Sequence, residues 1–128
     1  MKIALRRAIA ATALLAAATL AQALEIQPYS EAALADAQKA GKPVAVHFHA
    51  EWCPTCKQQE KALAALKAES GLDLTVLVAD YDKEKDLKKR LKVRSQSVMV
   101  VFRGMDEKAR VNGDVEAAAF RKAFRAAL

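Results

Sequence analysis

The sequence predicts an α/β domain in which a central mixed sheet of about four strands is flanked by helices on both faces. Segments with helical periodicity alternate along the chain with short apolar runs that are rich in β-branched residues. After the third such run, a glycine-containing turn leads to a more polar β-rich segment and then to a last amphipathic helix. This order is typical of parallel strands joined by helices and followed by an antiparallel hairpin.

The first half of the domain is predicted to contain two helices around one strand. Ser30 is expected to cap a helix over residues 30–40, and Gly41 is expected to end it. A buried strand is expected over residues 44–49, where most side chains are apolar. A longer helix over residues 53–70 should follow, because its apolar side chains recur along one side.

The second half is predicted to contain the remaining strands and two more helices. Residues 74–79 are nearly all apolar, as in a strand that is covered on both faces, and should pair in parallel with the first strand. An amphipathic helix is expected over residues 83–92. Strands are expected over residues 98–102 and near 108–112, joined as a hairpin, and the last helix over residues 115–128.

The first 23 residues are predicted to be a cleaved signal peptide, which leaves residues 24–128 as the domain. Three basic residues and no acidic one precede an apolar stretch over residues 8–20, and Ala21-Gln22-Ala23 has the small-x-small pattern that signal peptidases accept. An uncleaved anchor is the alternative, although a permanent span needs about 20 apolar residues. We therefore expect an exported protein, either periplasmic or secreted.

The charge of the chain argues against nucleic acid as a partner. The formal net charge is +6, from 21 basic and 15 acidic residues, and removal of the three basic leader residues leaves 18 basic residues and a net charge of +3. That excess is too small to indicate nucleic-acid binding. The basic run over residues 86–92 is interrupted by leucines, so we interpret it as the solvated face of a helix. No feature indicates an oligomer, and a monomer is expected.

The chain contains only two cysteines, Cys53 and Cys56, and they are three residues apart. A disulfide that closes so short a loop stabilises a fold little, so the pair is predicted to carry out redox chemistry. The pair follows a predicted strand and opens a helix, where unpaired N–H groups and the helix dipole favour a thiolate. Cys53 is expected to be the exposed nucleophile, and Cys56 is expected to resolve the mixed disulfide.

The residues around this pair resemble the thioredoxin family. Phe48-His49-Ala50-Glu51-Trp52-Cys53-Pro54-Thr55-Cys56-Lys57 is similar to the active-site segment of that family, and residues 42–46 and 93–104 are similar to its strand entry and its substrate-loop segment. In element order the resemblance covers residues 32–128. It implies a thioredoxin-like fold and a thiol–disulfide oxidoreductase that needs no bound cofactor.

Several neighbours of the pair are candidate supporting residues. Trp52 is expected to be a partly exposed recognition residue rather than a core residue. Lys57 could favour the thiolate electrostatically, or could simply be solvated. The loop that contains Gln96, Ser97 and Val98 resembles the substrate-binding loop of the family and could offer backbone hydrogen bonds to an extended substrate.

Three positions depart from the family pattern. Ser97 stands where members usually have a cis-proline, and a trans peptide bond is expected there because a non-proline cis bond costs about 2.5–4 kcal/mol. His47 aligns with a buried aspartate; it could relay a proton from Cys56, stabilise a thiolate if protonated, or be an ordinary core residue. Pro54-Thr55 replaces Gly-Pro between the cysteines, so the direction of electron flow cannot be carried over from the family.

The predicted function is dithiol–disulfide exchange with exported protein substrates, acting as a reductase supplied by a membrane-linked redox partner. The substrates would be protein disulfides or dithiols. The alternative is a non-enzymatic, copper-type metal-binding module that uses Cys53, Cys56 and His49 as ligands. A third possibility is a binding module in which the cysteine site is vestigial.

Overall fold

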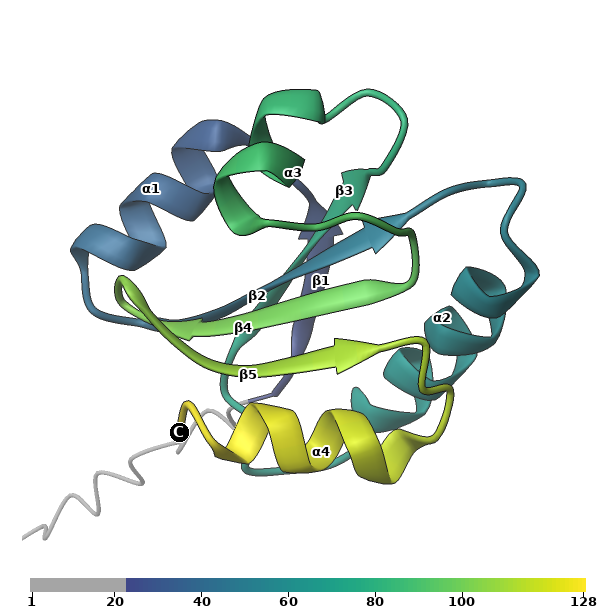
Figure 1. Ribbon diagram of the computed structural model, residues 1–128. Coiled ribbons are helices and arrows are strands. Elements are labelled where there is room, and N and C mark those ends of the chain that lie inside the picture. Colours follow the sequence, from purple (N-terminus) through teal and green to yellow (C-terminus); the bar gives the residue numbers. More distant parts are fainter. Residues whose placement is uncertain (1–22) are drawn as a thin grey trace, which may run out of the picture.

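The computed structural model describes residues 23–128, which form one mixed sheet covered by helices (Figure 1). In chain order the elements are β1 (Glu25–Pro28), α1 (Glu31–Lys39), β2 (Pro43–His49), α2 (Pro54–Leu66), β3 (Thr75–Asp80), α3 (Lys85–Leu91), β4 (Val98–Arg103), β5 (Asp106–Asn112) and α4 (Ala117–Arg125). The predicted fold class is confirmed.

The sheet has the strand order β1-β3-β2-β4-β5. As predicted, β2 and β3 are parallel and are joined by the helix that carries the cysteines, while β4 pairs antiparallel with both β2 and β5. The sheet has five strands. The prediction of about four was one short because it did not include β1. That strand is only four residues long, is largely exposed and pairs only with β3 at the edge of the sheet. Its sequence therefore lacks the alternation of apolar and polar residues that marks a half-buried strand.

Alternate residues of β2 divide the core into two layers. Val44, Val46 and Phe48 face α1 and α3, in a cluster that includes Leu34 and Leu87. The intervening residues of β2 face the opposite side, where α2 and α4 cover the sheet (Figure 1). His47 and His49, two positions apart in the strand, share this second face, and their ring centroids are 5.9 Å apart.

The helix ends follow local capping chemistry. The Ser30 hydroxyl accepts a hydrogen bond from the Ala33 N–H at 3.0 Å, which confirms the predicted cap of α1. By contrast, α2 ends at Leu66, earlier than the predicted residue 70. The N–H groups of Ala68 and Glu69 donate to carbonyls three residues earlier rather than four, which is the pattern of a 3₁₀ turn and ends the α-helix.

The predicted signal peptide, except for Ala23, lies outside the described residues. Leu24 is the first core residue of the described part, with 1% of its surface exposed, and β1 begins directly after it. None of the helices in residues 23–128 combines the length and the apolar character needed to cross a membrane.

Candidate active site

Cys53 lies between the end of β2 and the start of α2, and it is the N-cap of that helix. Its backbone is extended, with φ −95° and ψ 109°. Pro54 occupies the first turn of the helix, where backbone N–H groups have no partner within the helix, so the N–H that proline lacks costs no hydrogen bond. The Cys53 Sγ takes the place of the usual capping oxygen, because it accepts the Cys56 N–H at 3.1 Å. The helix start is therefore built around the sulfur.

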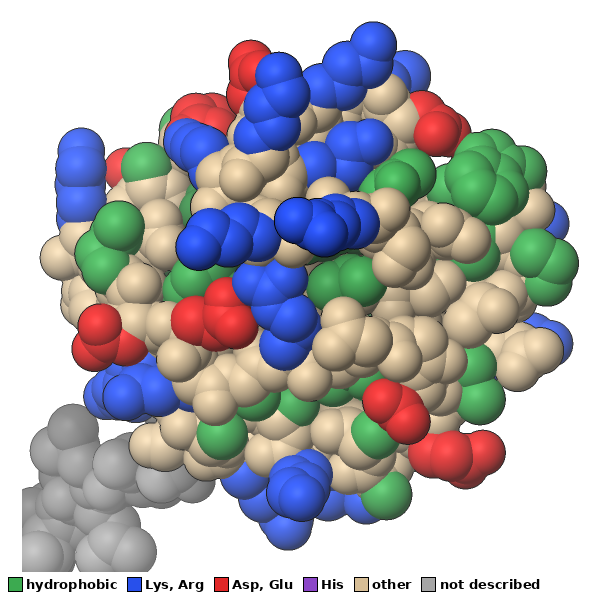
Figure 2. Space-filling model, in the orientation of Figure 1, with side chains coloured by type: hydrophobic (Ala, Val, Ile, Leu, Met, Phe, Trp, Pro, Cys, Tyr) green, Lys and Arg blue, Asp and Glu red, His purple; other side chains and the backbone are tan. Residues whose placement is uncertain are grey.

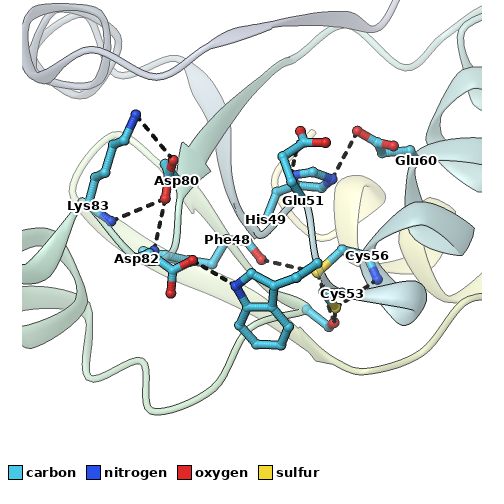
Figure 3. A network of polar contacts seen from close by, with 11 residues as sticks. Phe48, His49, Glu51, Cys53, Cys56, Glu60, Asp80, Asp82 and Lys83 are labelled. Atoms are coloured by element: carbon cyan, nitrogen blue, oxygen red, sulfur yellow. Dashed lines mark hydrogen bonds and ion pairs between the residues drawn. The ribbon is translucent and has the colours of Figure 1, made fainter.

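The two thiols are reduced and share one hydroxyl neighbour. Ser97 Oγ lies 3.1 Å from Cys53 Sγ and 3.1 Å from Cys56 Sγ. The Cys56 thiol is also 3.9 Å from the carbonyl oxygen of Phe48, to which it can donate (Figure 3). Ser97 directly precedes β4, so the site brings together the end of β2, the start of α2 and the loop that leads into β4.

The surroundings push the two thiol pKa values apart. Burial acts to raise the pKa of Cys53, but hydrogen bonds from the Cys56 and Ser97 side chains and from backbone N–H groups outweigh it, so the pKa is lowered. Burial first, and then the hydrogen bond to Cys53, raise the pKa of Cys56. A Cys53 thiolate beside a Cys56 thiol is the arrangement that a nucleophile and a resolving group require.

The expected exposure of Cys53 is wrong for this reduced state. Only 1% of its surface is exposed, and Cys56 is fully buried. Ala50 forms one buried cluster with the two cysteines, Tyr81 packs against that cluster, and the Ser97 hydroxyl contacts both sulfurs. The sequence showed that Cys53 opens the helix, but not that side chains from the loops after β3 and before β4 would cover it.

Comparison with known proteins now identifies the family. A protein-family model described as Thioredoxin matches residues 25–126. The chain belongs to the thioredoxin family. It is a thiol–disulfide oxidoreductase in which Cys53 and Cys56 form the C-x-x-C pair, and protein disulfides are the substrates on which this family acts.

Individual relatives agree with this assignment. The chain is 33% identical over 72 residues to Thioredoxin-1 of Drosophila yakuba, covering 56% of this chain and 67% of that protein. It is 33% identical over 79 residues to the bifunctional thioredoxin reductase/thioredoxin of Mycobacterium leprae, covering 62% of this chain but only 17% of that protein. The crystal structure of Trxlp from Edwardsiella tarda is similar with a TM-score of 0.71 and 35% identity, covering 77% of this chain and 96% of that one.

Ser97 differs from a cis-proline in both shape and chemistry. No cis peptide bond occurs in residues 23–128, as expected, and Ser97 instead has a left-handed backbone with φ 63°. Its N–H donates to Phe48 O at 3.0 Å, and its carbonyl accepts the Gly113 N–H at 2.9 Å. Both backbone groups of Ser97 are hydrogen-bonded inside the protein. Backbone hydrogen bonds from this loop to an extended substrate therefore stay a prediction for Gln96 and Val98.

Trp52 and Lys57 occupy the surface around the thioredoxin-type site. Trp52 is 58% exposed, so it is not a core residue, and its indole N–H donates to Asp82 Oδ2 at 2.7 Å. Asp80 accepts the N–H groups of Asp82 and Lys83, a side-chain-to-backbone pattern that is typical of turns. Lys57 is exposed, and its ammonium has no hydrogen bond or ion pair within residues 23–128, so its role stays a prediction.

Gln59 is a site residue that the sequence reasoning missed. Its amide nitrogen donates to Ser97 O at 3.0 Å and to Asp114 O at 2.8 Å, and its Oε1 lies 2.8 Å from His47 Nε2. Both N–H bonds of Gln59 are used, so Oε1 is the acceptor and His47 Nε2 carries a proton. The available signal was a polar residue among Cys56, Leu63 and Leu66 on the buried side of the helix.

His47 is a neutral core histidine in this arrangement. Burial, partly offset by the bond to Gln59 and assisted by His49, lowers the pKa of His47 to about 4. Its Nδ1 is buried without a hydrogen-bond partner among the described residues, and no hydrogen bond joins it to Cys56 there. The geometry therefore favours the core-residue interpretation over a protonated group that stabilises the thiolate.

The ligand set of the metal-binding alternative is not assembled. His49 lies instead between two carboxylates, with Nε2 3.1 Å from Glu60 Oε1 and Nδ1 3.8 Å from Glu51 Oε1 (Figure 3). Within the part of the chain that the structure describes, no three His, Cys, Asp or Glu side chains are grouped so that they could hold a metal ion.

The basic run of the sequence forms the outer side of α3, as predicted. Leu87 and Leu91 pack into the core, while Lys and Arg side chains gather over this helix in Figure 2. The ammonium of Lys88 lies 3.7 Å from the centre of the Tyr81 ring. Tyr81 also packs against the cysteines, so this basic surface adjoins the redox site.

Proposed function

We propose that this thioredoxin-family domain reduces disulfides of exported proteins and receives its electrons from a membrane-linked donor. The observation that carries the proposal is the pairing of a hydrogen-bonded Cys53 sulfur with a Cys56 thiol at the start of α2. This site can attack a disulfide with the first sulfur and close on itself with the second.

The reaction proceeds in two sulfur exchanges. The Cys53 thiolate attacks one sulfur of the substrate disulfide, which forms a mixed disulfide and releases the other substrate sulfur as a thiolate that takes a proton from water. The Cys56 sulfur then attacks Cys53 Sγ, loses its proton to water and releases the second substrate sulfur. Two electrons have passed to the substrate, and a Cys53–Cys56 disulfide remains for the donor to reduce.

The export part of the proposal is supported by the leader-like sequence of the first 23 residues. Removal of these residues would leave every helix and strand of the described domain, since β1 begins at Glu25. The mature form is proposed to be a monomer, which light scattering would test.

The test of substrate and location uses a trapping variant. The full-length chain with Cys56→Ser, produced with a C-terminal tag in a Gram-negative host, should accumulate mixed disulfides with proteins of the periplasm. A Cys53→Ser, Cys56→Ser double variant is the matched control and should trap nothing. N-terminal sequencing should find Leu24 first. Adducts with cytoplasmic proteins only, or an intact leader on all of the protein, would contradict the export proposal.

The direction of electron flow is tested by the reduction potential of the Cys53–Cys56 pair in glutathione buffers. A reductase should have a value near about −270 mV, whereas a value near about −120 mV would indicate an oxidant that introduces disulfides. The second result would overturn the reductase proposal without affecting the assignment to the thioredoxin family.

A further inference from the structure

One hydroxyl group faces both redox sulfurs at the same distance. Ser97 Oγ is 3.1 Å from each Sγ, and only 4% of the Ser97 surface is exposed. A serine hydroxyl has a single proton to donate and turns about its C–O bond, so it can donate to one sulfur at a time and accept from the other.

The two sulfurs need that proton at different moments. When the reduced pair loses a proton, the negative charge falls on Cys53 rather than on Cys56, since hydrogen bonds lower the pKa of Cys53 while burial raises the pKa of Cys56. In the mixed disulfide Cys53 Sγ is bonded to a substrate sulfur and carries no charge, and the negative charge then develops on Cys56 as it attacks. The hydrogen-bond donor that stabilises the nucleophile must therefore change partners between the two steps.

We propose that Ser97 is a catalytic residue whose hydroxyl donates to the Cys53 thiolate in the first exchange and then turns to donate to the Cys56 sulfur in the second. In the first state the Cys56 S–H also donates to the Cys53 sulfur. Once Cys53 has formed the mixed disulfide, the Ser97 O–H points to Cys56 Sγ, which releases its proton to water and attacks Cys53 Sγ. The departing substrate thiolate takes a proton from water, and Ser97 ends the cycle unchanged.

The backbone around Ser97 is fixed in a way that suits this role. Three hydrogen bonds hold its main chain, from its own N–H to Phe48 O and to its carbonyl from Gly113 N and Gln59 Nε2. They maintain a left-handed φ of 63°, which is uncommon for a residue other than glycine. With the main chain held, the hydroxyl can turn between the sulfurs without moving away from either.

The test measures the two exchange steps separately in the full domain. Alkylation of Cys53 by iodoacetamide as a function of pH reports the first nucleophile. Stopped-flow reaction with 5,5′-dithiobis(2-nitrobenzoic acid) reports the second, because the release rate that no longer depends on reagent concentration is the attack by Cys56. The variants are Ser97→Ala and Ser97→Gly, and Ser95→Ala, an exposed serine of the same loop, is the matched control.

Ser97→Ala and Ser97→Gly should each slow Cys53 alkylation near pH 6 and the attack by Cys56 by about tenfold or more, the size expected for a lost hydrogen bond to a charged sulfur. Ser95→Ala should match the wild type. Glycine tolerates the left-handed backbone, so wild-type rates in Ser97→Gly would assign the effect to backbone strain and overturn the proposal. A change of less than about twofold in either step of both Ser97 variants would also overturn it.

The inference rests on thiol–disulfide exchange by the cysteine pair, and not on the location or direction of that exchange. Release of two thiolate equivalents by the wild type, with no 2-nitro-5-thiobenzoate left on the protein in its mass spectrum, establishes the exchange before any variant is compared. If the wild type released no thiolate, thiol–disulfide exchange itself would be refuted. If the wild type reacted but loss of the Ser97 hydroxyl changed neither rate, only the role of Ser97 would be refuted.

Discussion

Acidification from about pH 7 to about pH 4.5 is expected to destabilise the protein through His47. In the unfolded chain this imidazole takes up its proton near the ordinary pKa of 6.5, whereas in the folded protein burial lowers the pKa of His47 to about 4. Between these two values the unfolded state binds more protons than the folded state. The contribution is therefore absent above pH 6.5 and destabilises the fold increasingly as the pH falls toward 4.

The magnitude follows from the two pKa values. A fall from 6.5 to about 4 corresponds to about 3 kcal/mol in total, at about 1.36 kcal/mol per pH unit. By about pH 4.5 roughly 2 kcal/mol of this should have been lost. That is a large part of the free energy of unfolding of a typical domain, about 5–15 kcal/mol.

The assay is urea unfolding of the reduced protein, followed by far-UV circular dichroism at both pH values. His47→Gln removes the titrating group and keeps an N–H that can donate to Gln59 Oε1, so it should lose about 2 kcal/mol less than the wild type on acidification. Lys61→Gln, on the exposed side of α2, is the control, and it should follow the wild type. Equal losses in the wild type and in His47→Gln would refute the reasoning that His47 is buried and neutral.

Three further predictions concern the thiols, the core and a helix cap. Because the pKa of Cys53 is lowered and that of Cys56 is raised, iodoacetamide near neutral pH should label Cys53 and leave Cys56 unmodified until denaturant is added, and equal labelling in peptide mass spectra would contradict this. Leu63 is 1% exposed, so Leu63→Ala should lower the free energy of unfolding by about 2–5 kcal/mol, while Lys61→Ala on the exposed side of α2 should change it by less than about 0.5 kcal/mol. Ser30→Ala should cost about 1 kcal/mol in the same urea assay, and an unchanged midpoint would show that the cap hydrogen bond contributes nothing.

Several of the predictions that the structure confirms depend on neighbours in the chain. The Ser30 cap and the helix start at Cys53 each depend on residues within one turn, and the hydrogen bond from Cys56 N to Cys53 Sγ spans three positions. The paired strands β2 and β3 were recognisable because burial on both faces requires nearly continuous apolar runs. The edge strand β1 has no such burial and left no comparable signal.

By itself, the sequence determined the α/β class, the strand–cysteine–helix unit and the redox pair, because periodicity, capping and C-x-x-C spacing are local properties. Only the tertiary structure decided that Ser97, 44 positions from Cys53 and 41 from Cys56, brings one hydroxyl to both sulfurs. It also decided that Gln59 joins His47 to the Ser97 loop and that Cys53 is buried. These contacts exist because antiparallel pairing of β4 with β2 brings the start of one strand to the end of the other, beside the first turn of α2.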